Sequence, residues 1–275
     1  GSLCPITMTS AAIPVLSHEP MFAALADKLF CEAHDARDLP LGGKSAILVG
    51  MGLTEKQGGS DLRGTQTEAV PAGSGGRGAA YLLTGHKWFF SAPMCDAHLV
   101  LARAPEGLSA FFVPRWRAEG CRNAVLVQRL KDKLGNRSNA SAEVEFIDAQ
   151  GTLVGEPGRG IATLAAMASL TRLDCAIASA ALMRQALSQA LHHARYRVAF
   201  GRTLAQQPLM MNVLAGPALE SEAALLLVLR LAQAQDLGET TLLRVLTPAA
   251  KFWICKRAPE FAGECMEVLG GNGYI

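Results

Sequence analysis

The segment Met51–Asp61, which reads MGLTEKQGGSD, combines residue types that suit the binding of a phosphate or a carbonyl-rich ring. It follows the short apolar run Ser45–Gly50, which is typical of a strand. Adjacent glycines let a backbone approach a ligand closely, and threonine and serine hydroxyls with nearby backbone N–H groups can donate hydrogen bonds to it. A glycine-rich turn with local serine and aspartate capping fits the same letters, so composition alone leaves both interpretations open.

Other patterns with known chemistry are missing or stand in the wrong context. Gly73, Gly75 and Gly78 spell G-x-G-x-x-G, but they precede a strand-like run and do not open a helix, so we predict a flexible hairpin loop. The P-loop, G-x-S-x-G and H-E-x-x-H motifs do not occur. The seven cysteines include no C-x-x-C pair, which favours thiols of a cytoplasmic protein over disulfides or a zinc site. We therefore predict no metal site.

The composition bounds the class of protein. The chain has 275 residues, of which 50% are hydrophobic and 18% charged, and its net charge is +2. Such a chain is not disordered, it suggests about two domains, and its charge is too balanced to predict nucleic-acid binding. The apolar surplus suggests that some surface faces partners. The most apolar stretch, Ile161–Met183, contains Arg172 and Asp174 near its middle, so we expect a buried helix and no membrane span.

The sequence shows a strand-like pattern followed by a helix-like pattern, which together predict an α+β protein. Strands with turn signals between them indicate a β-barrel or sandwich; they are expected at Ser45–Gly50, Tyr81–Ser91 with a central Thr-Gly-His turn, His98–Arg103, Leu108–Pro114, Ala124–Arg129 and Ala142–Ile147. Long helices joined by short loops indicate an antiparallel bundle; they are expected at Ile161–Phe200, Gln206–Asp236 and Glu239–Leu269. Gly216-Pro217 and Pro248 should kink or interrupt two of these helices. One more helix is expected at Met21–Ala33, preceded by irregular chain.

Five segments carry a resemblance to a known family. They are MGLTEKQGGSD, GHKWFFS (Gly85–Ser91), KLGNRSNASAEVEF (Lys133–Phe146), RVAFG (Arg197–Gly201) and LGGNGY (Leu269–Tyr274). In order and spacing they resemble the motifs of the acyl-CoA dehydrogenases over nearly the whole chain. The resemblance implies the end of an N-terminal helical domain at 1–40, a middle, flavin-binding β-barrel or sandwich domain at 41–158, and an antiparallel long-helix bundle at 159–275. It also implies that both ends are truncated.

The resemblance implies FAD as the cofactor. Thr54 would contact the pyrimidine side of the flavin, and Ser60 with Gly59 the pyrophosphate. Phe89 stands where the family usually has a tryptophan that packs on the ring, and Ser91 where it has a threonine near flavin N5. The full set of cofactor-binding residues that it implies is Met51, Leu53, Thr54, Gly59, Ser60, Phe89, Phe90, Ser91, Arg197, Phe200, Gly270 and Gly271.

The last four of these residues imply an assembly. In the family, the arginine at the position of Arg197 reaches the FAD of a neighbouring subunit, and Phe200, Gly270 and Gly271 would flank that cofactor. A guanidinium group suits recognition of a diphosphate. The resemblance therefore implies a homo-oligomer, from a dimer to a tetramer.

The reaction implied by the resemblance is α,β-dehydrogenation of an acyl-CoA, which needs a carboxylate base. One family position for this glutamate holds Thr171 beside Arg172, which we expect at most to line the substrate, and the other lies beyond Ile275. Asp174 is turned about 300° from Thr171 around the helix, since each residue adds about 100°. We therefore assign no catalytic residue and expect this chain alone to be inactive.

A second function stays open. Within the family, the wording TEKQGGSD, KWFFS and LKDKLGNRSNAS most resembles a subgroup linked to DNA alkylation damage. That resemblance implies a protective, DNA-associated protein with little turnover, whose DNA contact lies in an extension outside this chain. Arg195, Arg197 and Arg202 form a small basic cluster, but FAD pyrophosphate binding explains it equally well. A non-catalytic fragment with neither activity is the third possibility.

Overall fold

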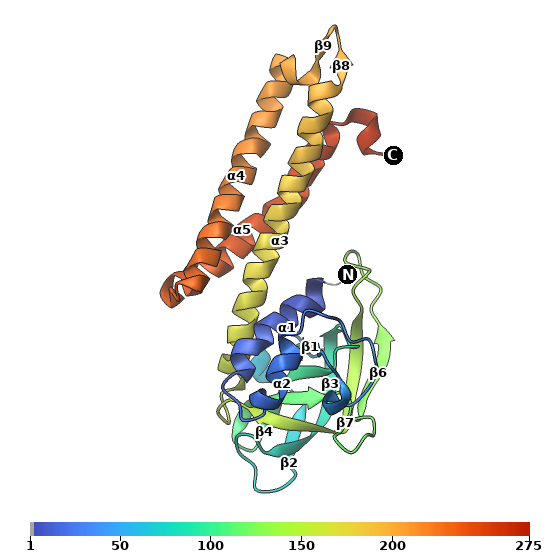
Figure 1. Cartoon of the computed structure of the whole chain (residues 1–275), viewed down its shortest axis with the longest axis vertical. Helices are drawn as coiled ribbons and strands as arrows, with labels where there is room; N and C mark the ends of the chain where they lie inside the picture. The colour runs from blue at the N-terminus through green and yellow to red at the C-terminus, as the bar shows by residue number, and fades with distance from the viewer. Residues whose placement is uncertain (1–2) are drawn as a thin grey trace. The chain divides into compact units, whose positions relative to one another are not determined.

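The protein is described by a computed structural model that covers residues 3–275. The chain divides into two compact units, and the boundary between them falls within one helix, after Ala168. We call residues 3–168 the β unit and Ser169–Ile275 the helical unit, and each is described by itself (Figure 1). The predicted α+β class, with a β-barrel domain followed by long helices, is confirmed.

A closed barrel forms the centre of the β unit. Its strands follow the order β1-β4-β2-β3-β7-β5, and β5 pairs back onto β4, while β6 pairs only with β7. The strands are β1 (Val49–Gly52), β2 (Glu68–Pro71), β3 (Ala80–Ser91), β4 (Ala97–Ala104), β5 (Gly107–Pro114), β6 (Val125–Leu130) and β7 (Ser141–Val154). The barrel interior is apolar and includes Tyr81 and Phe111, whose ring centroids are 5.1 Å apart in an edge contact.

The predicted turn inside Tyr81–Ser91 is wrong, because β3 continues through it. The pairing with β7 shifts register between Leu83 and Gly85, which is a β-bulge. Gly85 has φ +148°, and a Cβ there would lie 2.6 Å from the Cα of Thr67, so the glycine permits a close backbone approach. The predicted hairpin loop at Gly73–Gly78 is confirmed as the connection between antiparallel β2 and β3.

Two helices precede the barrel. They are α1 (Leu3–Leu16) and α2 (Phe22–Leu29), so the irregular chain expected before Met21 is in fact largely helical. Polar residues and Pro14 weaken the helical pattern of α1, but its contact with the barrel holds it in place. The N–H of Val49 in β1 donates to Thr9 Oγ1 of α1 over 2.9 Å.

Three long helices build the helical unit, in which the second along the chain runs antiparallel to both the first and the third (Figure 1). They are α3 (Gly160–Tyr196), whose first turns belong to the β unit, α4 (Pro208–Asp236) and α5 (Thr240–Glu267). The predicted bundle is confirmed, with helix ends a few residues shorter. A short hairpin, made of the two-residue strands β8 (Val198–Ala199) and β9 (Arg202–Thr203), lies between α3 and α4. Short 3₁₀ turns are η1 (Leu41–Gly43), η2 (Leu62–Gly64), η3 (Leu204–Gln206) and η4 (Gly270–Gly273).

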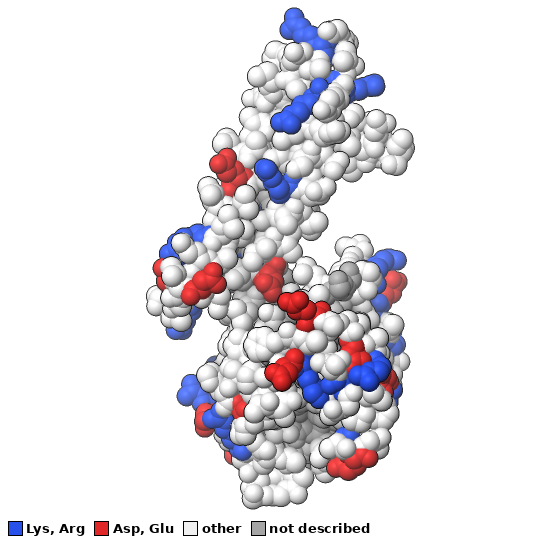
Figure 2. Space-filling view, viewed as in Figure 1, with Lys and Arg blue, Asp and Glu red and all other residues white. Residues whose placement is uncertain are grey.

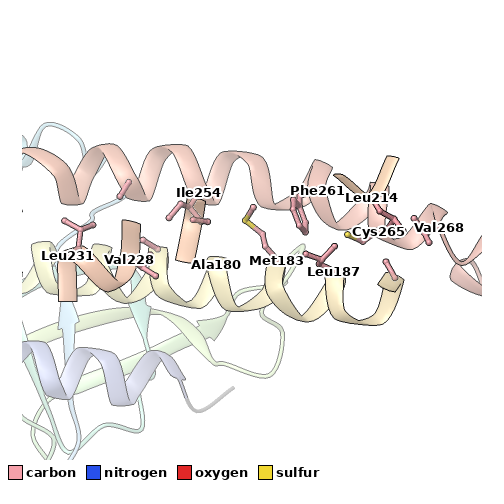
Figure 3. Packing of buried hydrophobic residues seen from close by; sticks show 14 of the residues in the cluster. Ala180, Met183, Leu187, Leu214, Val228, Leu231, Ile254, Phe261, Cys265 and Val268 are labelled. Carbon is pink, nitrogen blue, oxygen red and sulfur yellow. The ribbon is translucent and has the colours of Figure 1, made fainter. Parts of the chain in front are cut away.

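One apolar cluster holds these helices together. Met183 and Leu187 of α3 face Phe261 and Cys265 of α5, and α4 adds Leu214 (Figure 3). Pro217 and Pro248 were predicted to kink or interrupt their helices; they do not interrupt them, because α4 and α5 each continue as one helix through them. Burial of the cluster outweighs the loss of a backbone hydrogen bond at each proline.

The outer faces of α3 and α4 remain apolar and exposed. Each helix is long and apolar enough to span a membrane by length and composition, and 22% of each apolar window is buried. The expectation of a buried helix at Ile161–Met183 therefore fails for most of its surface in this chain. Figure 2 shows few charged side chains along the visible side of the helices, and Lys and Arg gathered at the end that carries β8 and β9.

Candidate functional site

The two segments of the candidate site in the β unit lie side by side. Thr54 follows β1, and its carbonyl oxygen accepts a hydrogen bond of 2.8 Å from the N–H of Trp88 in β3. Phe89 comes next in β3 and is 52% exposed, which is unusual for a large aromatic side chain. Ser91 ends the strand, half-buried, and pairs with Ser141 of β7. The structure thus places Thr54 next to the strand that carries Phe89 and Ser91.

A buried ion pair links the same two segments. Lys87 Nζ lies 2.6 Å from Glu55 Oε1, and their side chains are 0% and 1% exposed. Burial by itself raises the pKa of Glu55, but hydrogen bonds from Lys87, Thr67 and the Gln66 amide outweigh it and lower that pKa to about 2. Burial lowers the pKa of Lys87, which the Glu55 carboxylate partly opposes. Glu55 is therefore ionised at neutral pH.

The glycine-rich loop leaves its backbone and hydroxyl groups accessible. A Cβ on Gly59 would lie 2.4 Å from Thr54 Oγ1, so Thr54 packs directly against the backbone of Gly59. Gly58 has φ +141° and nothing within 4 Å of a built Cβ, and Ser60 is exposed. Hydroxyl and N–H donors in this arrangement can receive a phosphate or a ring carbonyl.

A cation lies beside the exposed aromatic ring. Lys131 Nζ is 4.8 Å from the ring centroid of Phe89 and 3.5 Å from that of Trp88. The same Nζ donates to Glu143 Oε1 over 2.6 Å, so its position is fixed. An aromatic face next to a cation suits a planar group that carries partial negative charge.

Phe90, which was also predicted to bind the cofactor, points its ring into the barrel. It is 1% exposed and stacks on His98 with a centroid distance of 3.9 Å and an interplanar angle of 25°. Burial lowers the pKa of His98 to about 3, so this imidazole is neutral. Met51 and Leu53 lie half-buried on either side of Gly52, whose Cβ would lie 2.6 Å from the Phe90 ring. The Phe90 ring therefore packs against the backbone of Gly52 at the end of β1.

The helical unit holds a shallow pocket of about 230 Å³. Arg197, Gly270 and Gly271 line it together with His193 and Asn272. Gly270 has φ +60°, a conformation that favours glycine.

Phe200 does not line this pocket and belongs to the turn between β8 and β9, where it is 98% exposed with φ +51°. The helical unit therefore gathers Arg197 with the two glycines and leaves Phe200 on the surface.

The expected substrate-lining residues lie on α3. Thr171 is half-buried and Arg172 exposed, and Asp174 is half-buried. Threonine has no carboxylate, so the position offers no general base. Within residues 3–275, no group of three or more His, Cys, Asp or Glu residues could hold a metal ion, and no disulfide is formed.

Sequence reasoning missed Glu55 and Lys87. Charged residues next to polar ones are normally solvated, so composition gave no reason to expect burial. A signal was present in the strand pattern, since Tyr81, Leu83 and Lys87 are separated by even numbers of residues and all three are buried.

Comparison with known protein families agrees with this architecture. Residues 158–275 match the acyl-CoA dehydrogenase C-terminal domain and residues 50–149 match the acyl-CoA dehydrogenase middle domain. Residues 1–36 match the N-terminal domain of the adaptive response protein AidB. AidB of Escherichia coli (strain K12) is 52% identical over 280 residues, which cover 100% of this chain and 51% of AidB. The chain spans about half the length of the curated relatives it matches.

Solved structures share the fold. Caenorhabditis elegans ACDH-11 in complex with C11-CoA superposes with a TM-score of 0.86 at 31% identity and covers 100% of this chain and 48% of that protein. A glutaryl-CoA dehydrogenase of Mycobacterium smegmatis in complex with FADH2 has a TM-score of 0.69 at 21% identity, over 85% of this chain and 58% of that one. By its domain matches, its relatives and its fold, the chain belongs to the acyl-CoA dehydrogenase family.

Proposed function

We propose that the protein is an FAD-dependent oxidoreductase of the acyl-CoA dehydrogenase type. The observation that carries this proposal is the hydrogen bond from Trp88 to Thr54, which joins the glycine-rich loop to the strand bearing Phe89 and Ser91. Family membership supports redox chemistry with a flavin in general terms. The site geometry supports it for these residues.

The residues present fit FAD. Phe89 offers an exposed aromatic face for a planar ring system, and Lys131 lies next to it. The hydroxyls of Thr54 and Ser91 are donors for ring carbonyl and nitrogen atoms, while the open backbone at Gly58 suits a diphosphate. The pocket formed by Arg197, Gly270 and Gly271 suits the same kind of anion.

Bound FAD would supply the hydride acceptor for oxidation of an acyl-CoA at its α,β bond. This chain's own residues would bind and orient it. Thr54 would donate to the pyrimidine carbonyl side, where negative charge develops on reduction, and Ser91 would donate near N5. Phe89 would shield one ring face from water. The base position on α3 holds Thr171, which has no carboxylate to accept the α-proton. We therefore propose that this chain alone has no turnover.

The proposed substrate class is an acyl-CoA, and the proposed assembly is a homo-oligomer, a dimer or a tetramer. The exposed apolar faces of α3 and α4 support the assembly. Light scattering after gel filtration tests it: a monomer at micromolar concentration contradicts the assembly. The substrate class is tested by dye reduction with acyl-CoAs of varied chain length in the protein together with any flanking segments of its gene product. No reduction with any of them contradicts that class.

FAD binding is the direct test of the proposed function. We expect the purified protein to be yellow, or to bind added FAD with quenching of the flavin fluorescence. Thr54→Ala should weaken binding by roughly tenfold, the loss of one hydrogen bond. Glu145→Gln, on an exposed position of β7, is the control and should bind normally. Absence of FAD both after purification and after titration contradicts the proposal.

A second candidate is a protective role in the response to DNA alkylation, in which the whole protein contacts DNA. The match of residues 1–36 to the N-terminal domain of AidB and the identity to AidB favour it. The net charge of +2 gives this chain little general attraction for DNA. A salt titration of DNA affinity tests the candidate, and an affinity that does not change with salt removes it.

A further inference from the structure

The ion pair between Glu55 and Lys87 lies where the two segments of the candidate site meet. Glu55 directly follows Thr54, and only Trp88 separates Lys87 from Phe89. The two charged atoms are 2.6 Å apart and neither side chain reaches solvent. The pair is therefore close to every candidate flavin contact of the β unit along the chain, without being exposed to a ligand itself.

Stability alone does not account for this pair. Removing two charges from water carries a desolvation penalty that their attraction offsets only in part, and apolar residues of similar volume are often as stable in such places. The buried neighbours along β3 are apolar, Tyr81, Leu83 and Phe90 among them. Ion-pair stability therefore gives no sufficient reason for two charges in these surroundings, and the hydrogen bonds of the pair point to a geometric task.

That task is visible in the hydrogen bonds of the Glu55 carboxylate. Oε1 accepts from Lys87 Nζ over 2.6 Å and from the hydroxyl and N–H of Thr67 over 2.6 and 3.0 Å. Oε2 accepts from the Gln66 N–H and from Gln57 Nε2, both over 2.7 Å. The carboxylate thus holds both ends of the loop that contains Gly59 and Ser60. A glutamine offers one acceptor oxygen in place of two and cannot reproduce this set.

We propose that Glu55 and Lys87 are positioning residues of the flavin site. Glu55 fixes the shape of the loop that presents Gly59 and Ser60, and Lys87 ties that loop to the strand that presents Phe89 and Ser91. This inference rests on the proposed function. It adds two residues that the family motifs, as matched above, did not assign to the cofactor.

The test compares two buried ion pairs of the same unit. Glu55→Gln, Lys87→Met and the double variant remove one pair. Lys44→Met removes the other, in which Lys44 and Asp96 are 2.6 Å apart and both 4% exposed. The Lys44 side chain contacts none of the candidate flavin residues through a hydrogen bond. The FAD dissociation constant and the urea midpoint are measured for every variant.

We expect Glu55→Gln and Lys87→Met to raise the FAD dissociation constant by roughly tenfold or more. Lys44→Met should lower the urea midpoint to a similar extent but leave FAD affinity within about twofold. The double variant should regain urea midpoint without regaining affinity, and it also serves if a single variant does not fold. Equal losses of affinity in Lys44→Met and Glu55→Gln at equal midpoint would overturn the proposal, because the pair would then act through stability alone.

Amide hydrogen exchange separates this inference from the proposed function. If the unaltered protein binds no FAD, the proposed function fails, but the loop can still be examined. Exchange of the Gln66 and Thr67 amides should accelerate by roughly tenfold or more in Glu55→Gln, because each amide donates to the carboxylate. Lys44→Met should leave them unchanged. Unchanged exchange in Glu55→Gln overturns the inference whatever the protein binds.

Discussion

The contact between Gly59 and Thr54 gives a direct test of the loop geometry. In Gly59→Ala, the new Cβ would lie 2.4 Å from Thr54 Oγ1 and 2.9 Å from its Cγ2, whereas ordinary contacts begin at 3.4 Å. The threonine side chain must therefore move by about 1 Å. Such a shift would break the proposed hydrogen bond from Thr54 to the flavin, since that bond requires a donor–acceptor distance of about 2.5–3.0 Å.

The expected magnitude follows from that one hydrogen bond. Its loss is worth about 1.4 kcal/mol, so the FAD dissociation constant should rise by roughly tenfold. The free energy of unfolding should change by less than about 1 kcal/mol, because Thr54 can turn away and alanine restricts the unfolded chain. Flavin fluorescence quenching measures the first quantity and urea unfolding the second.

Two variants decide whether the reasoning is right. Gly64→Ala lies in the same loop, and a Cβ there meets nothing within 4 Å, so it should bind FAD like the unaltered protein. In a Thr54→Ala background, Gly59→Ala should have little further effect, because its main partner has been removed. Gly59→Ala with FAD affinity equal to that of Gly64→Ala, while Thr54→Ala is weakened, would refute the reasoning.

Three further predictions concern stability. Phe261→Ala, at a residue 4% exposed in the helical cluster, should lower the free energy of unfolding by about 3–5 kcal/mol in guanidinium titration, and the exposed Leu219→Ala by less than about 0.5. Gly85→Ala should lower it by about 2 kcal/mol or more, because φ is +148° and the Cβ meets the Thr67 backbone; the open Gly42→Ala is its control. Since the pKa of Glu55 is about 2 when folded and ordinarily 4.5, the unfolded chain binds more protons between these values, so stability should fall as pH drops through them and Glu55→Gln should flatten this part of the profile.

The long helices were predictable because their pattern repeats over many turns. The predicted helix at Gln206–Asp236 corresponds to α4 at Pro208–Asp236, even though Pro217 argued for an interruption. A proline removes one hydrogen bond and crowds the preceding turn, which is a local effect. Leu214 and Val228 lie on either side of it in the same apolar cluster, and that burial is a tertiary effect that a local rule does not include.

The strands show the opposite limit. In the sequence, Gly85 predicts a turn. A glycine is needed there because Thr67, which is 18 residues away along the chain, lies close to its backbone. Strand β2 was not predicted because Glu68–Pro71 is short and half of its residues are exposed or charged. Both features depend on which strands pair, and local sequence periodicity does not predict strand pairing.

In the candidate site, too, the sequence indicated some residues and missed others. Thr54, Phe89 and Ser91 were found through motifs, because their residue types suit contact with a ligand. Glu55 and Lys87 act on the loop from inside, and their charges suggested exposure. Phe90 was assigned to the cofactor through the same matched motif as Phe89, yet its side chain is 1% exposed, since neighbouring strand residues face opposite sides. Motifs thus indicate the site, whereas burial decides which residues contact a ligand and which support it.

The exposed leucines of α4 bear on what surrounds the helical unit. Val228 and Leu231 face the cluster, whereas Leu219 and Leu226 are 71% and 60% exposed on other sides of the helix. A solitary surface helix would be polar there. A bilayer would cover such faces, but Arg172 and Asp174 in α3 would each add about 2.5–3.5 kcal/mol at its centre. Helices of further subunits cover leucines equally well and tolerate charged side chains at their edges, so the proposed homo-oligomer accounts for both the apolar faces and the charges between them.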